Sequence, residues 1–384
     1  MDFDLNDDQR RIQEAVREFA RYEVEPVAQQ LDAEGRFPVE LVHKVGQAGV
    51  MSIPFPEKLG GMGLGTFEAV LALEQLAQAD QSLAVTAMVS MATGLILMRF
   101  GTEAQIERFL PDIMTGKCLG AIAGTEPQAG SDTSAFRTRA VAVDGGWAIT
   151  GEKAYITNAG TVITSYVMVL ASTRVENEHR SFTLFLVPAG SAGFTPGERY
   201  KKMGWKSSDT RPLYFDDCRV GADMIIGEAH RGRHLLHKGY QQARLFLSAC
   251  SLGLAQASLE RALQYAKDRK AFGGTLGSLQ MIQEKIAEMA VLVDSARLLT
   301  YRAAVHADAG RADLKELGMA KYWATDVGSR CADMALQIHG GWGFMDDCAV
   351  SRYYRDNRVC TIGDGASEIQ KLVIARELGL DVRF

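Results

Sequence analysis

The spacing of apolar residues changes twice along the chain, and this change limits the possible folds most strongly. In residues 5–115 apolar side chains recur at helical intervals, as in Phe67–Phe100. In residues 117–227 short segments rich in β-branched and aromatic residues alternate with turn signals, including a candidate hairpin turn at 144–146. From residue 229 onward the helical interval returns. The order is therefore α, then β, then α.

This order predicts an α+β protein with three domains. We expect an N-terminal α-helical domain over 1–116 and a middle domain of antiparallel strands, built as a barrel or sandwich, over 117–228. Residues 229–384 are expected to form a four-helix bundle, because its helices are long and carry narrow apolar stripes. One such stripe consists of Ile282, Ile286, Met289, Val293 and Ala296.

Charge and composition exclude several classes of function. The chain has 384 residues with 42 basic and 47 acidic side chains, a net charge of −5, which argues against nucleic acid as the main partner. We expect no membrane insertion, since no apolar run approaches the ~20 residues of a span. The acidic N-terminus and six scattered cysteines predict a cytoplasmic protein with reduced thiols. The histidines lack metal-ligand spacing, so no metal is expected.

The chain contains neither a G-x-G-x-x-G motif nor a P-loop, which disfavours a Rossmann dehydrogenase. The glycines at 60–65 follow no predicted strand and are expected to form a loop.

Five motifs together carry a more specific signal. They are Thr125–Asp132 (TEPQAGSD), Gly151–Asn158 (GEKAYITN), Asp268–Gly273 (DRKAFG), Gln337–Gly343 (QIHGGWG), and Tyr354–Asp356 (YRD) followed by Ile362–Gln370 (IGDGASEIQ). In this order and on an α–β–α chain, they resemble the acyl-CoA dehydrogenase flavoproteins over essentially the whole length.

The resemblance implies FAD as cofactor and a set of residues that bind it. A flavin needs hydrogen bonds at its ring edge, a cation at its pyrophosphate and apolar walls; Arg269 would be the cation. By resemblance the cofactor-binding residues are Ile122, Thr125, Gly130, Ser131, Tyr155, Thr157, Arg269, Phe272, Gln280, Gln337, Gly340, Gly341, Ala366 and Glu368.

Each motif taken alone has an ordinary structural alternative. Thr125–Ser131 could be a simple turn, Tyr155 a core aromatic and Arg269 a solvent-exposed arginine at a helix end. The glycines that follow Gln337 could only cap a helix. In the family this turn meets the dinucleotide of a neighbouring subunit, which implies a homotetramer. The family commonly has glycine where this chain has Gln128, so the backbone geometry of that loop is left open.

Asp364 is the predicted catalytic base, which would remove the α-proton of an acyl thioester while hydride passes to flavin N5. The family commonly reads Ile-Tyr-Glu-Gly-Thr where this chain has IGDGA at 362–366. The carboxylate is therefore kept, but on a side chain shorter by about 1.5 Å. Because a base misplaced by about 1 Å can lose on the order of 10²-fold in rate, the substrate approaches closer, the backbone shifts, or the chemistry differs.

Two further observations bear on Asp364. The other family position for the base, directly before Arg244, is occupied by Ala243. Alternatively, Asp364 is a loop acid favoured by the dipole of the next helix, with Ser367 and Gln370 as its capping box. We favour catalysis, because loop acids in the site of a cofactor-dependent family are usually functional.

The substrate-binding residues implied by the resemblance are Ser131, Arg244, Gly363 and Gly365. Gly363 and Ala366 replace the bulkier tyrosine and threonine of the common pattern, which favours a short, branched or alicyclic acyl group; cyclohexanecarboxyl-CoA dehydrogenases also use an aspartate base. The predicted function is oxidation of an acyl-CoA to its 2-enoyl-CoA, with electrons passed to an electron-transferring flavoprotein. The alternatives are a reductase, a desulfinase or biosynthetic tailoring enzyme of the same fold, and a non-catalytic flavin-binding protein.

Overall fold

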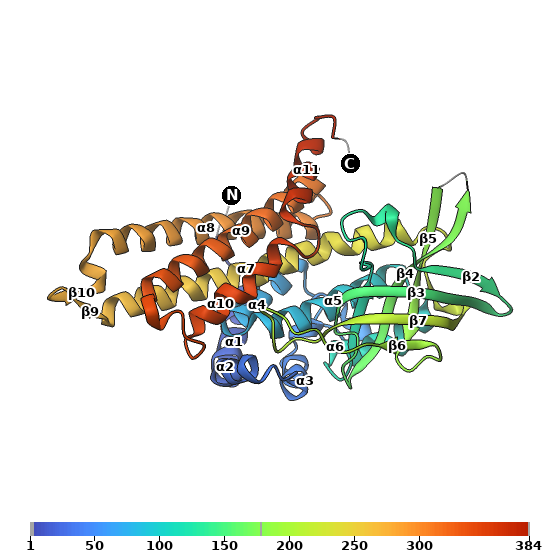
Figure 1. Cartoon of the computed structure of the whole chain (residues 1–384), viewed down its shortest axis with the longest axis horizontal. Helices are drawn as coiled ribbons and strands as arrows, with labels where there is room; N and C mark the ends of the chain where they lie inside the picture. The colour runs from blue at the N-terminus through green and yellow to red at the C-terminus, as the bar shows by residue number, and fades with distance from the viewer. Residues whose placement is uncertain (1–3, 177–178, 383–384) are drawn as a thin grey trace.

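The computed structural model describes residues 4–176 and 179–382, and in them a sheet lies beside an elongated helical body (Figure 1). The N-terminal helices are α1 (Asp7–Phe19), α2 (Glu25–Glu34), α3 (Val39–Gln47), α4 (Thr66–Ala79), α5 (Gln81–Phe100) and α6 (Glu103–Met114). The segment Phe67–Phe100 is interrupted at Asp80, which ends α4 and accepts a hydrogen bond from Leu83 N at 2.8 Å as the N-cap of α5. Gly101 follows α5 as its C-cap, as expected.

The middle domain is a single open sheet. Its strands are β1 (Leu119–Ala123), β2 (Arg139–Val143), β3 (Gly146–Thr157), β4 (Thr164–Glu176), β5 (His179–Pro188), β6 (Phe194–Pro196), β7 (Thr210–Gly221) and β8 (Ile225–Ile226). They lie in the order β6-β7-β3-β2-β4-β5-β8, and β1 pairs with β4. The pairing of β1 with β4 and the contact of β2 with β4 are parallel. The sheet is therefore mixed, which corrects the expectation of an entirely antiparallel barrel or sandwich.

The predicted hairpin turn is present between β2 and β3. Val143 pairs with Gly146 across the two-residue loop, and Gly145 has a φ of 74°, a left-handed conformation that glycine adopts without steric cost.

The C-terminal helices are α7 (Gly232–Asp268), α8 (Gln280–Asp308), α9 (Leu314–His339), α10 (Ala349–Asn357) and α11 (Ser367–Glu377), with the small hairpin β9 (Lys270–Ala271) and β10 (Gly274–Thr275) between α7 and α8. Met289, Val293 and Ala296 of the predicted stripe are buried, and Ile282 and Ile286 pack against the same core. The helical–sheet–helical fold class and its bundle are confirmed.

Helix α5 is long and apolar enough to cross a membrane by length and composition, and 72% of its most apolar window is buried inside the protein. The expectation that no segment reaches this length and apolarity is therefore wrong. Burial explains the apolar sequence: α5 packs against α4, α7 and β1, and Ser90 Oγ accepts a hydrogen bond from Gly120 N at 3.0 Å. A core helix with no solvent-facing side needs apolar residues all round.

The N-terminal helices share one hydrophobic core with the start of α7, since Leu71 and Leu76 of α4 lie in the same cluster as Phe246 and Leu247 of α7. The boundaries at residues 116 and 228 stay predictions.

Candidate active site

Asp364 lies in the short loop between the 3₁₀ turn Arg358–Thr361 and α11, and its side chain is half-buried. Its φ is 51°, and that of Gly365 is 90°, so two successive residues are left-handed. Aspartate tolerates this conformation better than most residues. The loop therefore turns sharply at the predicted base.

The expected capping box of α11 does not form. The N-cap is Ala366, which has no side chain to cap the helix. Ser367 Oγ instead donates to Thr361 O at 3.3 Å, and Gln370 Nε2 donates to Gly365 O at 2.9 Å. Both side chains thus hold the loop that carries Asp364: Ser367 binds the carbonyl that precedes the loop, and Gln370 binds the carbonyl of the left-handed Gly365.

Burial raises the pKa of Asp364, and the positive charges of Lys321 and Arg244 partly oppose this rise. Burial lowers the pKa of Lys321 to about 8, although the negative charge of Asp364 opposes this fall. Burial raises the pKa of the Tyr240 hydroxyl, and the charge of Asp364 adds to that rise. A carboxylate whose pKa is moved toward neutrality can accept a proton from carbon more readily than an ordinary surface acid.

Helix α7 connects Asp364 to the sheet. Arg244 Nε lies 3.5 Å from Asp364 O, and Tyr240, one helical turn earlier, faces the end of β1: a Cβ added to Gly124 would lie 2.7 Å from the Tyr240 hydroxyl. The predicted base and the predicted flavin-binding loop, which begins directly after Gly124, therefore both lie close to the same tyrosine.

A buried ion pair holds the loop Thr125–Ser131. Lys153 Nζ donates to Glu126 Oε1 at 2.9 Å and to Gly124 O at 2.8 Å, and the exposed fractions of the two side chains are 0% and 2%. Burial alone would raise the pKa of Glu126, but Lys153 and backbone donors lower it to about 2. The loop geometry is thus fixed from inside.

Gln128, the departure from the common motif, fits this loop. Its φ is not positive, so the backbone at this position does not require glycine. Its Nε2 donates to Glu126 Oε2 at 2.7 Å.

Tyr155 is not a core aromatic. It has a φ of 61°, lies at a register irregularity between β3 and β7, and is 64% exposed. Its ring packs beside Tyr200, with centroids 5.3 Å apart. Thr157 follows at the end of β3, and within the described residues its hydroxyl and that of Thr125 have no protein partner. An exposed flat ring beside free hydroxyl groups fits one face of a flavin and its polar edge.

Another group of predicted cofactor-binding residues forms a second cluster at the other end of the molecule. Arg269, Phe272 and Gln280 lie on or beside the β9–β10 hairpin, and the glycines after Gln337 end α9 next to it. Tyr265 of α7 stacks on His339 of α9 with ring centroids 4.3 Å apart. In Figure 1 this hairpin lies at the left end and the sheet at the right end.

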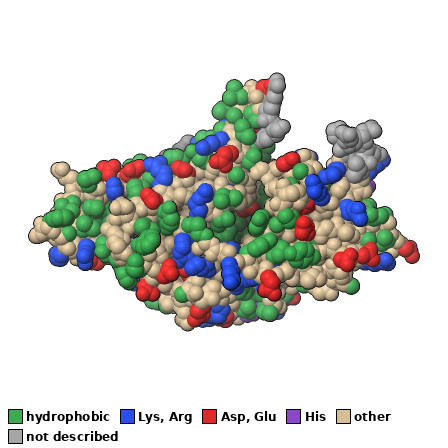
Figure 2. Space-filling model, in the orientation of Figure 1, with side chains coloured by type: hydrophobic (Ala, Val, Ile, Leu, Met, Phe, Trp, Pro, Cys, Tyr) green, Lys and Arg blue, Asp and Glu red, His purple; other side chains and the backbone are tan. Residues whose placement is uncertain are grey.

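The second cluster is exposed. Phe272 is 93% exposed and Met281 is 76% exposed, and Figure 2 shows hydrophobic side chains at this left end. From Arg244 to Arg269 the chain runs 25 positions along α7, or roughly 37 Å at about 1.5 Å per residue. One chain therefore does not bring the two clusters together.

The other predicted residues lie near Asp364 or on the flavin-binding loop. Gly363, Ala366 and Glu368 flank the base, with Glu368 exposed in the first turn of α11. Ile122 is half-buried on β1, and Gly130 and Ser131 are exposed on the loop. Sequence reasoning missed Lys321 and Tyr240. Lys321 could have been noticed as a lysine inside the apolar stripe formed by Leu317, Ala320 and Ala324 of α9.

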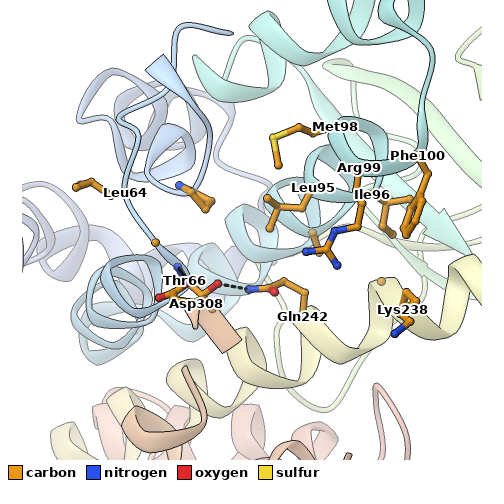
Figure 3. A pocket seen from close by; sticks show the side chains of 14 residues that line it. Leu64, Thr66, Leu95, Ile96, Met98, Arg99, Phe100, Lys238, Gln242 and Asp308 are labelled. Atoms are coloured by element: carbon orange, nitrogen blue, oxygen red, sulfur yellow. Dashed lines mark hydrogen bonds between the residues drawn. The ribbon is translucent and has the colours of Figure 1, made fainter. Parts of the chain in front are cut away.

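A pocket of about 150 Å³ lies elsewhere, between α5, α7 and the loop before α4 (Figure 3). Asp308 at its wall accepts hydrogen bonds from Thr66 N and Phe67 N, and Gln242 Nε2 donates to Thr66 Oγ1 at 3.2 Å. The pocket is smaller than the usual ~300 Å³ of a small-molecule site, and its polar groups serve mainly to cap α4.

An exposed aromatic ring and free hydroxyl groups near the end of a sheet strand, together with a half-buried carboxylate among helices, are typical of a class of flavoprotein oxidoreductases. Three domain-family models match the sequence: acyl-CoA dehydrogenase N-terminal domain over residues 6–117, middle domain over 121–218 and C-terminal domain over 230–379. The chain therefore belongs to the acyl-CoA dehydrogenase family, whose members depend on FAD and act on acyl-CoA substrates.

Individual relatives support this assignment over the full length. A probable acyl-CoA dehydrogenase YngJ of Bacillus subtilis is 38% identical over 98% of this chain and 100% of its own. Butyryl-CoA dehydrogenase from Megasphaera elsdenii has the same fold, with a TM-score of 0.95 and 33% identity over 98% of this chain and 100% of its own. An NADH-dependent acryloyl-CoA reductase of Anaerotignum propionicum is 35% identical over 98% of this chain and 96% of its own.

Proposed function

We propose that this enzyme oxidises a short, branched or alicyclic acyl-CoA to its 2-enoyl-CoA, with Asp364 as the base that removes the α-proton. The half-buried carboxylate of Asp364, with its raised pKa, at the junction of α7, α9 and α11 carries this proposal. FAD, when bound, supplies the hydride acceptor. The residues of this chain bind and orient the thioester, exclude water and accept the proton.

The loop gives each neighbour of Asp364 a role. The backbone N–H of Asp364 would polarise the thioester carbonyl as negative charge develops on it, an oxyanion-type stabilisation. Arg244 fixes the Asp364 carbonyl from α7. Glu126 and Lys153 hold the loop that would bind the flavin. Because Asp364 acts only when ionised, the rate of flavin reduction should fall as the pH is lowered through its raised pKa.

The space around Asp364 supports a compact, non-linear acyl group. A Cβ added to Gly363 would meet only Val359 O, at 3.6 Å, so that side of the base is open. One of the similar structures is a butyryl-CoA dehydrogenase, and this similarity favours a short acyl chain for the substrate of this enzyme. The shorter aspartate leaves further room for a substituent near the α-carbon.

The two clusters of predicted cofactor-binding residues support a site shared between two copies of this chain. Tyr155 and Thr157 of one copy would contact the flavin ring, while Arg269, Phe272 and Gln337 of the other would contact the dinucleotide. An exposed hairpin with Phe272 at 93% exposure is what such a contact would cover. Two such pairs would make a homotetramer, with an electron-transferring flavoprotein as electron acceptor and the cytoplasm as location.

A reductase is the second candidate, because the acryloyl-CoA reductase of A. propionicum is 35% identical to this chain. The two directions are separated by anaerobic mixing. A dehydrogenase loses its yellow colour with a panel of straight, branched and cyclic acyl-CoA thioesters. A reductase instead consumes an added electron donor, such as NADH, over many turnovers when the corresponding enoyl-CoA is supplied.

Asp364→Ala tests the base directly. We expect substrate-driven flavin reduction to be abolished while FAD stays bound, because Asp364 holds its proton-accepting oxygens near the substrate and other residues hold the cofactor. The measurement is anaerobic bleaching of the flavin absorbance, with FAD content measured after denaturation. Full turnover in this variant would show that another group is the base.

A further inference from the structure

Lys321 is a fully buried cation on α9 that sequence reasoning did not assign to the site. Its Nζ donates to Gly365 O at 2.8 Å. Gln370 Nε2 donates to the same oxygen at 2.9 Å. An ammonium group this deep is costly to bury unless it is paired, so this lysine has a specific task at the carbonyl next to Asp364.

The task concerns a strained turn. Asp364 and Gly365 have φ values of 51° and 90°, and such conformations persist only where the surroundings enforce them. Arg244 from α7 contacts the Asp364 carbonyl, and Lys321 from α9 holds the next one. Two consecutive carbonyls are thus fixed from two helices. Their orientation sets the direction of the Asp364 carboxylate and of its N–H.

The charges around Asp364 come from four elements. Helix α7 contributes Tyr240, Arg244 and Cys250, the 3₁₀ turn contributes Cys360, α9 contributes Lys321, and α11 contributes Glu368, which acts on Lys321. Lys321 and Arg244 are the cations of this set. Both lower the pKa of Asp364 against the effect of burial, and Lys321 lowers it more than Arg244 does. Without Lys321, burial would raise the pKa of Asp364 further.

We propose that Lys321 is a positioning residue for the base: it fixes the left-handed Asp364–Gly365 turn through the Gly365 carbonyl and places a positive charge beside the carboxylate. This inference rests on the proposed role of Asp364. Gln370 also fixes the Gly365 carbonyl, because it donates to the same oxygen. It places no positive charge beside the carboxylate, because its side chain is neutral. The two side chains therefore form a matched pair for an experiment.

Lys321→Met and Gln370→Met are compared with the wild-type holoenzyme. The measurement is the rate of anaerobic flavin reduction, between about pH 6 and 9, by an acyl-CoA that reduces the wild type. With Lys321→Met we expect the rate of flavin reduction to fall on the order of 10²-fold at neutral pH. We also expect the acid limb of the pH–rate profile, where the rate falls as Asp364 is protonated, to move to higher pH, while the FAD content stays unchanged. With Gln370→Met we expect a slower rate and an acid limb at the wild-type position. An unmoved limb in Lys321→Met, or an equal movement in both variants, overturns the proposal.

An infrared measurement and a second variant test the role of Lys321 independently of the proposed function. Infrared difference spectra follow the protonation of Asp364 without turnover, and its signal is assigned by its loss in Asp364→Asn. If no acyl-CoA reduces the wild type, the proposed function fails, and an Asp364 titration unchanged by Lys321→Met still overturns the inference. If Lys321→Met does not fold, Lys321→Arg keeps the charge; we expect a slower rate with an unmoved limb, and a moved limb contradicts the proposal.

Discussion

The two glycines that flank Asp364 have different physical reasons for being glycine. Gly365 has a φ of 90°, so its backbone conformation favours glycine, and an added Cβ, 2.5 Å from Gln370 Nε2, would also displace the end of that side chain. Gly363 lies outside the left-handed region and has open space beside it. Conformation therefore fixes Gly365, whereas neither conformation nor space requires glycine at position 363.

Gly363→Tyr should therefore narrow the substrate range rather than unfold the protein. We expect flavin reduction by branched and cyclic acyl-CoA to fall at least about tenfold relative to straight-chain substrates, because pocket contacts of this size discriminate by about 10–200-fold. Gly363→Ala is the control and should stay near wild type. Rates of anaerobic bleaching with each substrate check this, and an unchanged ratio in the tyrosine variant would place the acyl group elsewhere.

Among the elements, α10 connects segments that are far apart in the sequence. Its Arg352 donates to Asp80 Oδ2 at 3.2 Å and to Ala79 O at 3.1 Å, at the break between α4 and α5. Its Arg355 pairs with Asp32 of α2 at 2.5 Å. Its Asp356 accepts from Trp205 N at 2.6 Å. These charged contacts act together with the buried Val350 and Tyr353 of the same helix to determine where it docks.

Arg352→Met should destabilise the protein by about 3–5 kcal/mol, because it leaves the buried Asp80 without its cation. Arg352 and Asp80 are 4% and 2% exposed. Arg376→Met, which removes an ion pair with Glu377 at a 46% exposed side chain, should change stability by at most about 1 kcal/mol. Urea unfolding of both variants measures the difference, and equal stabilities would contradict the structural role of the buried pair.

At the scale of the whole molecule, α7 sets the distance between the two clusters. Its 37 residues form one uninterrupted helix, about 55 Å long. The base and the sheet lie near its start, and the β9–β10 hairpin lies at its end (Figure 1). A cofactor that contacts both clusters must therefore bridge two copies.

A mixing experiment tests this arrangement. Thr157→Ala with Tyr155→Ala in one chain, and Arg269→Ala with Phe272→Ala in another, should each lose FAD when expressed alone. In a two-fold dimer, co-expression gives hybrids in which one of the two sites is intact. We expect FAD to return to roughly a quarter of all sites. Differently tagged chains allow the hybrid to be purified, and a hybrid without FAD would show that the two clusters do not share a cofactor.

The repeat of apolar residues determined the order of helices and strands, because burial of one face imposes its period on the sequence. The hairpin turn between β2 and β3 was also predictable, since its glycine conformation is local. The parallel pairing of β1 with β4 was not, because it joins segments about 45 residues apart. The capping box predicted for α11 did not form, because Gln370 donates to Gly365 O in the left-handed turn just before the helix.

The sequence alone thus determined the family resemblance, the three zones and the carboxylate at position 364. The tertiary structure decided what surrounds that carboxylate: Lys321, Arg244 and Tyr240 lie 43, 120 and 124 positions before it and are brought together only by packing. It also decided that the two clusters of predicted cofactor-binding residues lie apart. Motifs depend on local residue order, whereas burial, charge environment and separation along a rigid helix are properties of the folded chain.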